Sequence, residues 1–141
     1  MSPKGGEMTT IDRLLADARS GLDRLEPAQA AEAMSRGALL IDTRPSEQRR
    51  RDGLVPGAII VERNVLEWRL DPTCPYRIRE LADPADYPHL ILMCNEGYSS
   101  SLAAATLQRL GVRRVTDVIG GFQAWVTCGL PVQRERRRDR P

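Results

Sequence analysis

The stretch from His89 to Leu110 constrains the fold more than any other part of the chain. Its first residues, His89–Met93, form an apolar run of strand length, and Ser100–Leu110 has the apolar spacing of a helix that buries one face. A polar turn, CNEGYS, separates the two at residues 94–99. This pattern predicts a buried strand that turns directly into a helix, which is the repeating unit of an α/β protein.

The rest of the chain alternates strands and helices in the same way. The predicted strands are short apolar or mixed runs between polar and turn residues, at 22–25, 38–43, 58–61, 89–93 and 114–119. Helical patterns with suitable start and stop residues lie between them, at 27–36, 45–51, 100–110 and 122–128. Because strands and helices alternate four or five times, we expect a parallel sheet with helices on both faces.

The length of 141 residues fits one domain. We place this domain at residues 10–132, with an N-terminal helix at 10–20. Residues 1–9 are predicted to be a disordered leader. Residues 133–141 are predicted to be a charged, solvated tail, because they contain five arginines.

Composition excludes several classes of protein. With 41% hydrophobic and 28% charged residues, the chain is typical of a globular domain. A net charge of +2 gives no electrostatic basis for nucleic-acid binding. No apolar run approaches the ~20 residues that span a bilayer, and the first residues lack the apolar segment of a signal peptide. We therefore expect no membrane association and a cytoplasmic location.

The three cysteines, Cys74, Cys94 and Cys128, are an odd number without close spacing, so they predict no disulfide framework. Together with a single histidine, His89, they also argue against a zinc cluster. Cys74 lies in a proline-rich connection and is a bystander or a second thiol. Cys128 is expected to pack in the core.

Cys94 is the candidate nucleophile because it stands where the predicted strand ends and a helix begins. A helix N-terminus offers unpaired N–H groups and a partial positive charge, and both favour the thiolate. Gly97 permits a tight turn. The hydroxyls at 99–101 are expected to cap the helix and to donate hydrogen bonds. The alternative from position alone is a buried structural cysteine.

Four sequence elements, in this order, resemble the rhodanese-like domain family. They are Asp42-Thr43-Arg44, the GLVPGA run at 53–58, the CNEGYS turn at 94–99, and GGFQAW at 120–125 followed by GLP at 129–131. The resemblance spans about residues 22–132. It implies a three-layer α/β fold with a five-stranded parallel sheet. It also implies sulfur transfer through a persulfide on Cys94, without a metal or an organic cofactor.

The resemblance also suggests roles around Cys94. The loop residues Asn95, Glu96, Gly97, Tyr98, Ser99 and Ser100 are expected to bind substrate, mainly through backbone N–H groups that form an anion nest. Arg63 is a candidate for cationic help, because the loop itself contains no arginine. Asp42 and Arg44 are expected to brace the scaffold near the site.

Two features of the loop set it apart. Glu96 places a carboxylate where an anionic donor would approach, so thiosulfate is expected to be a poor donor. Ser100 stands where phosphatases of the same fold carry a phosphate-binding arginine, which argues against phosphatase chemistry.

The resemblance therefore implies a rhodanese-type sulfurtransferase, and the alternative is a non-catalytic binding or sulfur-relay module. Expected partners are a small sulfur donor and a thiol acceptor, with an acceptor protein as a further option. We expect a monomer or a weak homodimer.

Overall fold

The computed structural model describes residues 7–83 and 86–134. Its elements, in chain order, are α1 (Thr10–Ser20), α2 (Pro27–Ser35), β1 (Leu39–Asp42), α3 (Ser46–Asp52), β2 (Ile59–Ile60), the 3-10 helix η2 (Arg63–Val65), α4 (Leu66–Leu70), the 3-10 helix η3 (Arg79–Leu81), β3 (Leu90–Met93), α5 (Ser99–Arg109), β4 (Val115–Asp117) and α6 (Gly121–Thr127). Most of the predicted leader at 1–9 and of the predicted tail at 133–141 lies outside the described residues. Within the tail, Gln133 pairs with Leu54 in an antiparallel bridge.

The strands form one parallel sheet in the order β2-β1-β3-β4. Asp42 is in register with Met93, and Leu92 is in register with Asp117. Because the strands are parallel, their carboxyl ends meet at one edge of the sheet. The residue after Met93 is Cys94, so the predicted nucleophile lies at this edge between two aspartates.

The expected fifth strand is wrong: the sheet of the described residues has four strands. At 22–25 only Leu25 pairs, in a single parallel bridge to Val118. Its N–H donates to the carbonyl of Asp117 at 3.1 Å. Pro27 already occupies the first turn of α2, and Glu26 is the N-cap, so the chain leaves the sheet one residue after Leu25.

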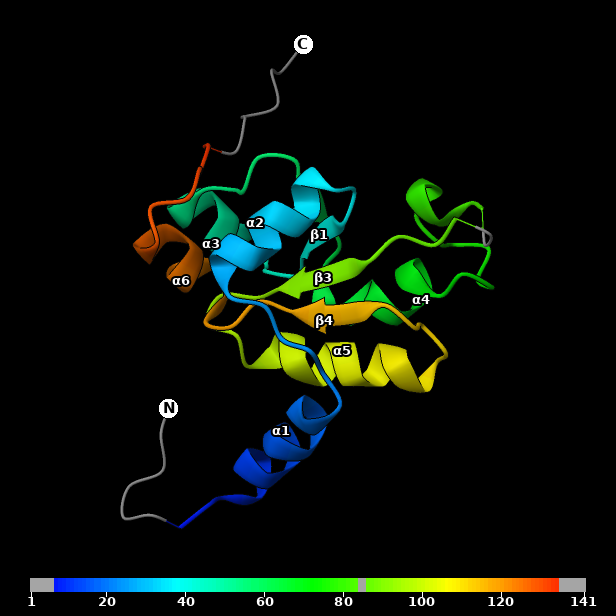
Figure 1. Ribbon diagram of the computed structural model, residues 1–141, viewed down its shortest axis with the longest axis horizontal. Coiled ribbons are helices and arrows are strands. Elements are labelled where there is room, and N and C mark those ends of the chain that lie inside the picture. Colours follow the sequence, from blue (N-terminus) through cyan, green and yellow to red (C-terminus); the bar gives the residue numbers. More distant parts are fainter. Residues whose placement is uncertain (1–6, 84–85, 135–141) are drawn as a thin grey trace.

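Helices cover both faces of the sheet, as predicted (Figure 1). Side chains alternate along the strands: Leu40, Ile91 and Met93 pack with residues of α2 and α6. Ile41, Leu90 and Leu92 pack on the other face, with residues of α4 and α5. Because successive side chains point to opposite faces and helices cover both faces, the central strands are continuous apolar runs.

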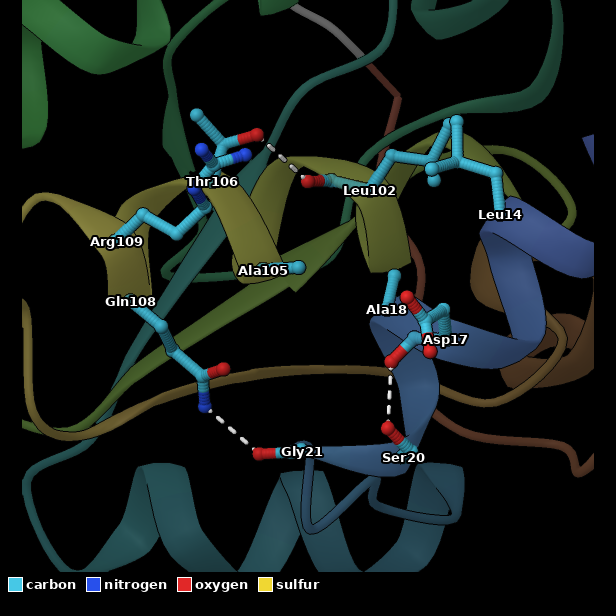
Figure 2. A pocket seen from close by; sticks show the side chains of 10 residues that line it. All are labelled: Leu14, Asp17, Ala18, Ser20, Gly21, Leu102, Ala105, Thr106, Gln108 and Arg109. Atoms are coloured by element: carbon cyan, nitrogen blue, oxygen red, sulfur yellow. Dashed lines mark hydrogen bonds between the residues drawn. The ribbon is translucent and has the colours of Figure 1, made fainter.

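The first helix, α1, lies outside these layers and packs on the outer side of α5 (Figure 1). Thr9 caps it in a capping box with Asp12, and the helix ends at Gly21. A pocket lies between α1 and α5, and Gln108 closes one side of it by donating to the carbonyl of Gly21 at 2.8 Å (Figure 2). Cys94 does not line this pocket. In residues 7–83 and 86–134, no helix combines the length and apolar character that crossing a membrane requires.

Candidate active site

Cys94 follows β3 directly, and α5 begins at Ser99. The cysteine residue is 6% exposed. The carbonyl of Cys94 accepts the N–H of Phe122 at 2.8 Å, which ties the start of the loop to α6. The cysteine is therefore held between the end of one strand and the starts of two helices.

The sulfur atom of Cys94 receives two backbone hydrogen bonds from its own loop. The N–H of Gly97 donates to Sγ at 3.1 Å, and the N–H of Ser100 donates at 3.4 Å. The second donor belongs to the first turn of α5, whose N-terminal N–H groups have no partner within the helix. This geometry favours negative charge on the sulfur.

Two glycines allow the loop to approach the start of α6. Gly97 has φ +86°, and a Cβ there would lie 2.7 Å from the backbone nitrogen of Gly120. Gly121 has φ +61°, and a Cβ there would overlap the carbonyl oxygen of Cys94. Each position therefore excludes a side chain both by conformation and by space.

Replacing Gly121 by Ala is expected to lower the free energy of unfolding by about 2–4 kcal/mol, since left-handed strain and a backbone clash add together. Gly129→Ala is the matched control: it has φ +74°, but a Cβ added there would meet no atom within 4 Å. We expect it to cost about 1 kcal/mol. Urea unfolding of the two variants measures the difference, and equal losses would contradict the close packing of the loop against α6.

Two of the loop's hydroxyls donate hydrogen bonds, but none of them caps the helix. The N-cap of α5 is Tyr98, and no side chain caps the helix, so the predicted serine cap is wrong. Instead, Ser100 and Ser101 each donate to Oδ2 of Asp117 at 2.7 Å. A hydroxyl has a single proton, so Ser100 accepts from the Cys94 thiol, at 3.2 Å, rather than donating to it.

Asp117 is fully buried at the end of β4. Besides the two serines, the guanidinium of Arg24 binds it, with Nε 2.8 Å from Oδ1. Asp117, Ser100 and Cys94 thus form a continuous chain of hydrogen bonds that ends on an arginine.

Arg19, from the last turn of α1, is a second guanidinium at the loop. It donates to the carbonyl of Gly97 at 2.7 Å and to the hydroxyl of Ser101 at 3.0 Å. Burial lowers the pKa of Arg19, and the like charge of Arg24 acts in the same direction, while Asp117 opposes both. Its guanidinium also lies over the Tyr98 ring.

The family is decided by comparison with known proteins. Residues 26–128 match the family model of the rhodanese-like domain. The chain belongs to the rhodanese-like family. The resemblance inferred from sequence motifs is therefore confirmed.

Named relatives cover different shares of this rhodanese-like chain. The thiosulfate sulfurtransferase GlpE of Haemophilus influenzae is 31% identical over 108 residues, which are 77% of this chain and 91% of the relative. The protein of the same name from Actinobacillus succinogenes is 42% identical over 55 residues, which are 38% of this chain and only half of that relative.

A solved structure from Rhodopseudomonas palustris has TM-score 0.78 and 30% identity, and the match covers 94% of this chain and all of the other. That protein is described as one of unknown function and a possible tyrosine phosphatase.

The rhodanese-like frame places the scaffold pair of the sequence prediction next to the loop. Asp42 and Arg44 form a fully buried ion pair, with Nη2 2.8 Å from Oδ2. The Arg44 guanidinium stacks 3.7 Å from the centre of the Phe122 ring, and the N–H of Phe122 binds the carbonyl of Cys94. The pair thus contacts the residue that holds the start of the loop.

Other predicted residues are more exposed. Glu96 and Ser99 are exposed, and Tyr98 is half-buried. The Asn95 amide oxygen accepts from Gln123 at 2.9 Å. Arg63 pairs with Glu67 at 2.9 Å, and a substrate contact for it stays a prediction. Cys128, expected in the core, is exposed: it is the C-cap residue of α6, after the last turn of the helix.

Sequence reasoning missed Arg19, Arg24 and Asp117, and it assigned Ser101 to a helix cap. Asp117 carried a usable signal, since it ends a buried strand as Asp42 does. The two arginines carried none, because each lies more than 70 residues from Gly97 in the sequence. In the part of the chain that the structure describes, no three potential metal ligands come together.

Proposed function

We propose that the protein is a sulfurtransferase that holds sulfane sulfur on Cys94 as a persulfide. The observation that supports this most is the pair of N–H groups, from Gly97 and Ser100, that donate to the Cys94 sulfur. A persulfide extends the side chain by one sulfur and keeps its negative charge, so the same N-terminal field of α5 favours it. The names of the Haemophilus and Actinobacillus relatives agree with this activity.

The reaction has two steps. The Cys94 thiolate attacks the outer sulfur of a donor such as thiosulfate, and a new S–S bond forms while sulfite leaves with the electron pair of the bond that breaks. Cyanide or an acceptor thiolate then attacks the outer sulfur of the persulfide. The S–S bond to Cys94 breaks, the product carries the sulfur away, and the thiolate returns.

Phosphatase chemistry is less well supported, although the Rhodopseudomonas palustris protein is described as a possible tyrosine phosphatase. The loop from Cys94 to Ser100 has no arginine to hold a phosphoryl group. Arg19 and Arg24 reach the loop, but both donate to the carbonyl of Gly97. We infer sulfur rather than phosphate as the transferred group.

The physiological partners that we propose are a small sulfur donor and a thiol acceptor, which is either a small molecule or a protein. If the protein only relays sulfur, Cys94 forms the persulfide without rapid turnover. We propose that the protein is a monomer or a weak homodimer in the cytoplasm, a reducing compartment in which a free thiol persists.

A donor panel tests the function. The protein is incubated with thiosulfate or 3-mercaptopyruvate, then with cyanide, and thiocyanate is measured; para-nitrophenyl phosphate is the phosphatase substrate. We expect thiocyanate above the protein-free background and no phosphatase turnover. A persulfide without thiocyanate turnover would favour the relay module, and phosphate release alone would refute sulfur transfer.

Glu96 gives a prediction about the donor. Glu96→Gln is expected to lower KM for thiosulfate about twofold at low salt, because it removes an exposed negative charge from the loop. The gain should shrink at 1 M salt, where screening acts within about 3 Å. Glu80→Gln, which removes an exposed carboxylate of η3, is the control and should leave KM unchanged. An unchanged or higher KM in Glu96→Gln would refute the electrostatic role of Glu96.

A further inference from the structure

Two guanidiniums reach the Cys94 loop from a segment that precedes the matched family domain at 26–128. Arg19 is in the last turn of α1, and Arg24 lies in the connection to α2. Both donate to the same acceptor, the carbonyl oxygen of Gly97, at 2.7 and 3.1 Å. Their place in the chain does not by itself require both charged donors to meet at one loop carbonyl.

The position of Arg19 is built into the packing of α1 on α5. Leu15 of α1 is buried, and Gly21 at the end of the helix is held by Gln108 of α5 (Figure 2). Arg19 lies between these two anchors in the sequence. Its side chain bridges Gly97 and Ser101, so α1 is fixed to the active-site loop as well as to the outer side of α5.

The acceptor explains what the arginines do for the loop. In a trans peptide the C=O and the following N–H point in opposite directions. Holding the Gly97 carbonyl toward the arginines therefore turns the N–H of Tyr98 away from them. Gly97 has a positive φ and no Cβ, so its own backbone sterics restrain the orientation of the Gly97–Tyr98 peptide only weakly.

The charges around Cys94 oppose one another. Asp117 on β4, which is linked to Cys94 through Ser100, and the exposed Glu96 of the loop are negative. The positive groups are Arg19 and Arg24, while Asp42 and Arg44 of the β1 end neutralise each other at Phe122. Alone, buried Asp117 would disfavour a thiolate and would hold the proton of the Ser100 hydroxyl. Arg24 and Ser101 also bind Asp117, so Ser100 is able to turn its proton toward the sulfur when Cys94 ionises.

We propose that Arg19 and Arg24 are positioning residues for the Cys94 loop: they hold the Gly97–Tyr98 peptide and offset Asp117, and so favour the anionic sulfur. This deepens the proposed sulfur transfer and rests on it for its biological meaning. The segment at residues 10–25 then contributes to the active site by holding the Cys94 loop.

The rate of Cys94 alkylation by iodoacetamide, followed by peptide mass against pH, tests the proposal without any sulfur transfer. Arg19→Ala should move the profile to higher pH by about 0.5–1 unit, which is a three- to tenfold loss of thiolate at a given pH below the midpoint. Asp117→Asn should move the profile to lower pH. Arg13→Ala removes an exposed charge from the same helix and should leave the profile unchanged.

Arg19→Lys separates charge from geometry. An ammonium keeps the charge but lacks the planar fork that reaches Gly97 and Ser101 together, so we expect partial recovery of the profile. Full recovery would contradict the two-acceptor geometry. Coincident profiles for Arg19→Ala and wild type would overturn the proposal, as would shifts of Arg19→Ala and Asp117→Asn in the same direction. If Asp117→Asn does not fold, the comparison of Arg19→Ala with Arg13→Ala decides.

A wild-type protein that forms no persulfide would refute the proposed function, yet the alkylation profiles would still test the arginines. A persulfide in the wild type together with unshifted profiles in the variants would refute only the positioning role of the arginines.

Discussion

Replacing Cys94 by Ser is expected to reduce thiocyanate formation from thiosulfate and cyanide to the protein-free background, a loss of more than about a thousandfold. A serine hydroxyl is not ionised near neutral pH and forms no persulfide. Ser differs from Cys by one atom, and its oxygen also accepts hydrogen bonds from the N–H groups of Gly97 and Ser100. The fold should therefore be kept. Initial rates measured at matched concentrations provide the comparison.

The other two cysteines are the controls for this variant. Cys74 is partly buried and Cys128 is exposed, and both are free thiols. Cys74→Ser and Cys128→Ser should keep the wild-type rate. Full activity in Cys94→Ser, or a large loss in Cys74→Ser, would mean that a different thiol accepts the sulfur.

Replacing Arg44 by Ala is expected to lower the free energy of unfolding by about 3–5 kcal/mol, because it leaves Asp42 as an unpaired buried charge. Both side chains of this pair have no exposed area. The change also removes the guanidinium from the face of Phe122 and from the carbonyl of Gly53. Urea unfolding at neutral pH measures the loss.

A surface pair supplies the control. Arg36, the C-cap residue of α2, binds Glu32 at 2.8 Å, but their side chains are 78% and 64% exposed, so Arg36→Ala should cost about 0.5 kcal/mol or less. The double variant Asp42→Asn, Arg44→Met removes both charges and should recover part of the stability. Similar losses for Arg44→Ala and Arg36→Ala would contradict the buried pair as a scaffold element.

Local patterns explain what could be predicted from the sequence. β3, the turn and α5 lie within about twenty residues, and their apolar spacing alone indicates a strand followed by a helix. The prediction of a fifth strand failed because Pro27 starts α2, so pairing with the sheet ends after Leu25. Local apolar character at 22–25 does not reveal how many residues remain for the sheet.

The site was predictable only where it is local. Cys94 and its N–H donors come from one loop, so strand, glycine and helix signals located them. The roles of Ser100 and Ser101 were misassigned because their acceptor, Asp117, comes from another strand. Arg19 and Arg24 depend on how α1 packs, and a single sequence does not show this packing.

The most direct measurement of the central claim is the mass of the Cys94 peptide after incubation with thiosulfate under non-reducing conditions. We predict one added sulfur atom on that peptide and its removal by cyanide with equal release of thiocyanate. Cys94→Ser should show no added sulfur. An unmodified Cys94 peptide, or sulfur added equally to the peptides of Cys74 and Cys128, would contradict persulfide formation at Cys94.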